Sequence, residues 1–158
     1  MRVSSLVSTS FLLTSLMAAG SAEAASPFRA MAGSWAGGGT LNMQSGEQER
    51  LRCRASYDTD GNEQLRLNIR CASDSYNIDL SSDVAYRGGT ISGQWSEASH
   101  NASGTIEGRA NGDRIEARAS GQTFSAGLSL TTRGNRQTIS IRPEGTEITG
   151  VNLELSRR

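Results

Sequence analysis

The segment from Arg50 to Cys71, RLRCRASYDTDGNEQLRLNIRC, decides the fold. On either side of the turn residues 60–62, apolar and polar side chains alternate with a period of two, which is typical of β-strands with one buried face. The Gly and Asn of that turn tolerate the positive φ angles that a tight hairpin requires. The segment therefore predicts an antiparallel hairpin with strands near 48–57 and 63–72.

The two cysteines of the chain lie in this hairpin. If the chain turns at residues 61–63, Cys53 faces Cys71 directly, and the alternation places both on the apolar face. Facing residues of an antiparallel pair come close enough for a disulfide if they form a non-hydrogen-bonded pair. We therefore expect a cross-strand bridge between Cys53 and Cys71, as suits an exported protein.

The same register places like charges together on the polar face of the hairpin. Arg54 faces Arg70, with Arg52 alongside, and this is unfavourable unless something neutralises the arginines. Arg52, Arg54 and Arg70 are therefore candidate ligand-binding residues for an anionic group. The alternative is a solvated face that is balanced by nearby acids, Glu47, Glu49 or Asp74.

The rest of the chain repeats the alternating pattern and short turns, with no apolar period of 3.6 that would predict a helix. A slip in the alternation near Gly150 indicates a β-bulge. An all-β antiparallel meander with one apolar face must roll up to bury that face and its edges, so we predict a small closed barrel, with a two-sheet sandwich as the alternative. The ten predicted strands are 35–44, 48–57, 63–72, 76–85, 89–97, 104–110, 113–119, 123–132, 135–142 and 145–156.

The first residues have the pattern of a secretory signal peptide. Arg2 precedes an apolar run, and a small-x-small site ends at Ala24, so we expect a signal over residues 1–24 that is cleaved after Ala24. We expect residues 25–32 to be a flexible segment and residues 33–158 to form a single domain, in the periplasm or secreted. An outer-membrane barrel is disfavoured because the chain lacks aromatic girdles.

Composition and isolated residues give little support for catalysis. The 16 basic residues, all Arg, balance 16 acidic ones, so the net charge is zero and gives no case for nucleic acid as a partner. His100 is the only histidine, and we read it as a loop residue with no acid placed to orient it. With both cysteines paired, no zinc site of ordinary composition remains. We expect no catalytic residue, no metal and no cofactor.

Two tryptophans and several small residues bear on ligand binding. Trp35 and Trp95 are large apolar side chains that suit core packing or, as candidate ligand-binding residues, stacking on a ligand. A ten-stranded barrel with small side chains facing its lumen could leave a cavity. The small residues that we assign to the lumen are Gly108, Ala110, Ala117, Ala119 and Gly127.

The triplet Gly33-Ser34-Trp35 at the start of the barrel resembles the Gly-x-Trp motif of the calycins. That resemblance implies that Arg157 or Arg158, near the last strand, stacks over Trp35. The runs 33–39, 52–57, 71–76 and 134–137 together are similar to a family of small exported β-barrel proteins of alphaproteobacteria. This second resemblance implies a Gram-negative periplasm and carries no known activity with it.

Three functions remain open from the sequence. The leading hypothesis is a non-enzymatic exported barrel that binds a small ligand or a component of the cell envelope. The second is a protein-interaction module, such as a periplasmic protease inhibitor whose segment from Ala25 to Met31 enters the protease cleft. The third is a hydrolase with an unfamiliar pair of carboxylates.

Overall fold

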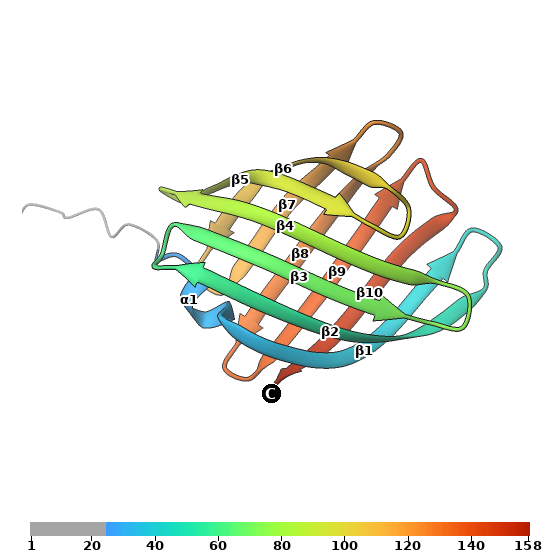
Figure 1. Cartoon of the computed structure of the whole chain (residues 1–158), viewed down its shortest axis with the longest axis horizontal. Coiled ribbons are helices and arrows are strands. Elements are labelled where there is room, and N and C mark those ends of the chain that lie inside the picture. Colours follow the sequence, from blue (N-terminus) through green and yellow to red (C-terminus); the bar gives the residue numbers. More distant parts are fainter. Residues whose placement is uncertain (1–24) are drawn as a thin grey trace, which may run out of the picture.

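The computed structural model describes residues 25–158, which form a closed ten-stranded antiparallel barrel (Figure 1). This confirms the predicted barrel over the sandwich. The predicted signal peptide lies outside the described residues. The strands are β1 (Gly33–Met43), β2 (Gln48–Asp60), β3 (Gln64–Ala72), β4 (Asn77–Arg87), β5 (Thr90–Glu97), β6 (Ala102–Asn111), β7 (Arg114–Gly121), β8 (Ser125–Arg133), β9 (Arg136–Glu144) and β10 (Ile148–Arg157).

Each strand pairs with its neighbours in the sequence, and β1 closes the ring by pairing with β10. In that closing pair, Asn42 lies opposite Gly150 while the next residue, Met43, lies opposite Ile148, so one residue of β10 has no partner there. This irregularity is the bulge that the slip in alternation predicts. It lets the residues of β10 on both sides of the bulge face the lumen.

The central hairpin has the predicted register. Cys53 lies opposite Cys71 and Arg54 opposite Arg70. A disulfide joins the two cysteines, whose Cα atoms are 4.1 Å apart. Both cysteines are buried in the core cluster, as their place on the apolar face predicts. The bridge therefore ties two strands together from the inside of the barrel.

Glycines let β1 come very close to β10. A Cβ atom added at Gly39 would lie 1.8 Å from the carbonyl oxygen of Asn152, and one added at Gly37 would lie 2.0 Å from that of Glu154. No side chain fits at such distances, so these two positions require glycine. The run of glycines in β1 thus permits the sharp coiling by which a small barrel closes.

A short helix, α1 (Phe28–Met31), closes one end of the barrel, where β2 connects to β3 (Figure 1). Phe28 and Met31 are 0% and 1% exposed, and both belong to the core cluster. The structure here differs from the expected flexible segment 25–32 and from the expected absence of helix. A single turn is too short to show a helical period in the sequence, and the two apolar side chains hold it in place by burial.

We call the end covered by α1 the closed end and the opposite end the open end. The hairpin turns of the open end connect β1 to β2, β3 to β4, β5 to β6, β7 to β8 and β9 to β10. Residues 25–158 contain no helix that is long and apolar enough to cross a membrane.

Candidate functional site

The lumen of the barrel contains a cavity of about 200 Å³. It extends from α1 toward the open end, between the strands β3 to β9. Its wall is almost wholly apolar, with Ser82 and Glu97 as the polar exceptions. The lining residues are Phe28, Met31, Leu65, Leu67, Leu80, Ser82, Val84, Ile91, Trp95, Glu97, Ile106, Ile115, Ala117, Ala119, Phe124, Ala126, Leu128, Leu130 and Ile141.

Small side chains on β7 leave room in the lumen, with Ala117 on the cavity wall. Gly108 pairs with Ala117 but does not line the cavity: a Cβ atom added to it would lie 2.5 Å from the Cβ of Ala117, so glycine there lets β6 and β7 approach closely. Ala119 also lines the cavity. The prediction for Gly127 is wrong: its neighbours Ala126 and Leu128 line the cavity, so strand alternation turns Gly127 to the outer face.

The exposure of the inward-facing residues indicates that the cavity opens at the open end. At the closed end, the inward-facing Trp35 and Tyr57 are both 1% exposed. Toward the open end, Leu80, Leu128 and Ile141 also line the cavity but remain half-buried rather than buried. The cavity is therefore a pocket with a floor made by α1 and a mouth at the open end.

Trp95 and Phe124 form an aromatic pair near the mouth. Their ring centroids are 5.4 Å apart, and both rings line the cavity. The indole N–H of Trp95 donates a hydrogen bond to the carbonyl oxygen of Thr105 at 3.1 Å, which fixes the ring in place. The structure thus places the candidate residue Trp95 where a ligand in the cavity would touch it.

Trp35, the other candidate, does not line the cavity. It contacts α1, the helix that closes the barrel, which we call the plug. Its indole N–H donates to the carbonyl oxygen of Met31 at 2.8 Å, and the guanidinium of Arg157 stacks over its ring at 4.3 Å. Arg157 also donates hydrogen bonds to the carbonyl oxygens of Ala30 and Ala32. The stacking is the geometry that the calycin resemblance implies, and here it fastens α1 to the last strand.

The polar groups of the cavity wall are already bonded to the protein. Ser82 donates to the carbonyl oxygen of Gln94 at 2.9 Å. Glu97, whose side chain is 11% exposed, accepts hydrogen bonds from the backbone N–H groups of Asp79, Ser99 and His100. Burial alone would raise the pKa of Glu97, but these bonds and one from the His100 ring outweigh it and lower the pKa.

His100 corrects one expectation from the sequence. Its Nδ1 lies 2.7 Å from Oε2 of Glu97, so an acid three residues earlier does orient the ring. The spacing was missed because residues i and i+3 meet here across a hairpin turn rather than on a helix. The imidazole ring also stacks on Tyr76, with centroids 6.0 Å apart.

Tyr76 links three hairpin turns of the open end. Its hydroxyl donates a hydrogen bond to Glu147 in the turn between β9 and β10, while its ring touches His100 in the turn between β5 and β6. The bond to Glu147 raises the pKa of Tyr76, because the ionised phenol would lose it. Beside it, Glu49 accepts hydrogen bonds from the hydroxyls of Ser73 and Ser75. Hydrogen bonds and a ring contact therefore connect the turns that surround the mouth.

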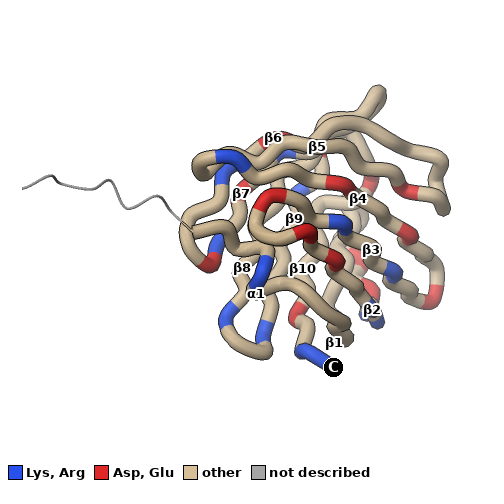
Figure 2. The backbone as a smooth tube through the Cα atoms, turned by 60° about the vertical axis from the view of Figure 1, so that its left-hand side comes forward, with Lys and Arg blue, Asp and Glu red and all other residues tan. Residues whose placement is uncertain are grey.

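The candidate arginines lie on the outer face of the barrel, away from the cavity. Arg70 forms an ion pair with Asp79 at 3.1 Å, an acid other than those named from the sequence. Arg52 and Arg54 are exposed and form no ion pair with any residue of the described part. Figure 2 shows basic and acidic residues side by side over β2, β3 and β4. Whether these arginines bind an anion stays a prediction.

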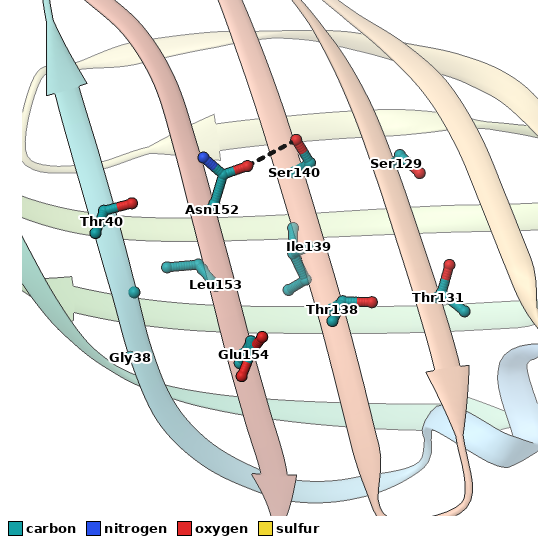
Figure 3. A pocket seen from close by; sticks show the side chains of 11 residues that line it. Gly38, Thr40, Ser129, Thr131, Thr138, Ile139, Ser140, Asn152, Leu153 and Glu154 are labelled. Atoms are coloured by element: carbon teal, nitrogen blue, oxygen red, sulfur yellow. Dashed lines mark hydrogen bonds between the residues drawn. The ribbon is translucent and has the colours of Figure 1, made fainter.

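A second hollow, of about 430 Å³, lies on the outer face across β1, β10, β9 and β8 (Figure 3). Hydroxyl and amide side chains cover it, and Ser140 donates to Asn152 at 3.0 Å. Its side chains, such as Thr40 and Thr138, are exposed. A ligand in this shallow trough would stay largely in water, unlike one in the lumen.

Comparison with known proteins places the fold. No family model matches the sequence, and no curated protein is significantly similar to it. The solved Rv2717c protein of M. tuberculosis has a similar structure, with a TM-score of 0.66 and 14% identity over 82% of this chain and 93% of that one. The protein EF1p2_mFAP2b, solved bound to DFHBI, has a TM-score of 0.51 and 10% identity over 82% of this chain and 95% of its own. At these identities the two structures show that the chain shares their barrel fold.

Proposed function

We propose that this protein is an exported, non-enzymatic barrel that binds a small apolar molecule in its lumen. The observation that carries the proposal is the apolar cavity of about 200 Å³ with a closed floor and a mouth at the open end. This volume lies between the roughly 150 Å³ of a cavity that admits benzene and the roughly 300 Å³ at which pockets for larger ligands begin. Scaled from the benzene cavity, it suits a ligand of about eight carbon atoms.

Further support comes from the fold and the disulfide. A barrel of similar fold has been solved with DFHBI bound, so folds of this kind are compatible with holding a small molecule. The Cys53–Cys71 bridge fits an oxidising compartment, in accord with export to a periplasm through a cleaved signal at residues 1–24. We also propose that the chain belongs to the calycins and to the alphaproteobacterial family that its sequence resembles.

The protease-inhibitor hypothesis finds less support. It needs the segment from Ala25 to Met31 to enter a partner's cleft, but Phe28 and Met31 are buried in the barrel. Withdrawing both side chains would expose them to water and open the floor of the cavity, which is costly. We therefore retain ligand binding as the function.

Calorimetric titration with octan-1-ol tests the proposal. At about 0.8 kcal/mol for each buried methylene, eight carbons give at most about 6 kcal/mol, so the tightest expected Kd is tens of micromolar. Ala117→Leu should abolish binding by filling the lumen, because Ala117 lines the cavity. The matched control, Ser129→Leu, adds the same bulk to the outer trough and should leave binding unchanged. Equal loss in both variants, or no heat with the wild type, would reject lumen binding.

A fluorescence measurement locates the ligand independently. Trp95 lines the cavity and Trp35 does not, so octan-1-ol should change the emission of a Trp35→Phe variant, in which Trp95 remains. A Trp95→Phe variant should respond little, because its remaining indole is 1% exposed beneath Arg157. The reverse pattern would place the ligand elsewhere.

A further inference from the structure

The net charge of zero conceals an excess of acidic residues at the open end of the barrel. We define the rim as the hairpin turns of the open end together with the two strand residues on either side of each turn. Within the rim there is no arginine. Its acidic residues are Glu47, Glu49, Asp74, Glu97, Glu144 and Glu147.

The strand register directs two acids of the rim, Glu97 and Glu49, to a different face from the arginines that adjoin the rim. Glu97 pairs with Leu80 and Glu49 pairs with Leu41, and both leucines face the lumen, so these two acids belong to the inward row. The arginines that directly adjoin the rim along their strands are Arg50, Arg70 and Arg142. They lie one residue out of phase with lumen residues and so belong to the outer row. Glu144 is the one rim acid with an arginine partner, Arg118 at 2.9 Å.

The cavity itself offers nothing to neutralise an anion. None of the residues that line it is an arginine or a histidine. Ser82 uses its hydroxyl to bond the carbonyl oxygen of Gln94. Glu97 already accepts about as many hydrogen bonds as an ionised carboxylate can, which keeps it charged at the mouth.

From this geometry we infer that the pocket selects apolar ligands whose polar group is neutral or cationic, and rejects carboxylates such as fatty acids. The inference rests on the proposed function and names its ligand class. A carboxylate that enters head first would be buried without a partner, which is costly. One that enters tail first would leave its charge beside Glu97 and Glu49, where like charges repel. A neutral hydroxyl avoids both costs, and an ammonium that enters tail first gains from the acidic rim.

Titration of the wild-type protein with octan-1-ol, octylammonium and octanoate at pH 7 and low salt tests the inference, because the three share one chain length. We expect octylammonium to bind at least as tightly as octan-1-ol, and octanoate to bind at least about tenfold more weakly. Octanoate binding as tightly as octan-1-ol would overturn the inference and leave the proposed function standing. Octylammonium binding as weakly as octanoate would also overturn the inference, because the pocket would then reject any charged ligand and not carboxylates in particular. Binding of none of the three would overturn the proposed function and the inference with it.

A pair of variants tests whether Glu97 causes the discrimination against octanoate. Glu97→Gln removes the charge of this acid at the mouth. It should reduce the gap in affinity, the ratio of the Kd of octanoate to that of octan-1-ol, several-fold. Glu144→Gln makes the same change of charge at the same end, on a residue held by Arg118 on the outer face, and should keep the gap. Circular dichroism confirms that each variant is folded. A gap that is unchanged in folded Glu97→Gln, or narrowed equally in both variants, would overturn the role of Glu97.

Discussion

Replacing Phe28 with Ala tests whether α1 is part of the folded barrel. Phe28 is 0% exposed, lines the cavity, and its ring meets the edge of Tyr86 with centroids 6.0 Å apart. Removing a fully buried phenylalanine costs about 3–5 kcal/mol, of which such an aromatic contact contributes about 1 kcal/mol. In a domain of this size the loss should lower the melting temperature by about 10 °C or more.

The assay is urea unfolding followed by circular dichroism, with Arg29→Ala as the matched control. Arg29 lies on the exposed side of the same helix, so its loss should change the free energy of unfolding by no more than about 0.5 kcal/mol. The Phe28→Ala variant should also gain affinity for decan-1-ol relative to octan-1-ol, because the floor of the cavity recedes. A loss of stability below about 1 kcal/mol, with no change in the preferred chain length, would refute the role of the plug.

Three further predictions concern the disulfide, the plug and acid sensitivity. Cys53→Ser should lower the free energy of unfolding by about 3 kcal/mol, because the bridge joins residues 18 apart in the sequence; melting that is indifferent to reductant in the wild type would count against this. Arg157→Ala should speed hydrogen exchange at the amide of Ala32 by weakening the contacts of α1, and unchanged exchange would show that Arg157 does not hold the helix. Because hydrogen bonds outweigh burial and lower the pKa of Glu97 below 4.5, its charged form stabilises the fold above that pH, and this contribution is lost as the pH falls through the lowered pKa. Melting temperatures of Glu97→Gln should therefore fall less steeply with acid than those of the wild type; parallel profiles would contradict this.

The strands and their register follow from local patterns that the sequence displays directly. Alternation along residues 50–71 and one turn sequence determine that Cys53 faces Cys71, because shifting a strand by one residue would turn its whole apolar row outward. The bulge near Gly150 follows in the same way from a broken alternation. Closure follows from the need to bury one face and both edges of the meander.

The features that were missed depend on contacts between distant residues. The helix at Phe28–Met31 is one turn long, and it is held against the barrel by the burial of Phe28 and Met31 and by hydrogen bonds from Trp35 and Arg157. The cavity depends on how the side chains of many strands fill a shared lumen, which no single strand reveals. The acidic rim depends on which turns come together at one end, so it becomes visible only once the order of the strands is known.

A crystal structure with 8-bromooctan-1-ol tests the central claim most directly, because the anomalous signal of bromine marks the position of the ligand. We predict the bromine in the lumen, near Phe28 and Met31, with the hydroxyl toward the rim near Glu97. Bromine in the outer trough beside Asn152, or none at any ordered position, would contradict the assignment of the lumen as the binding site.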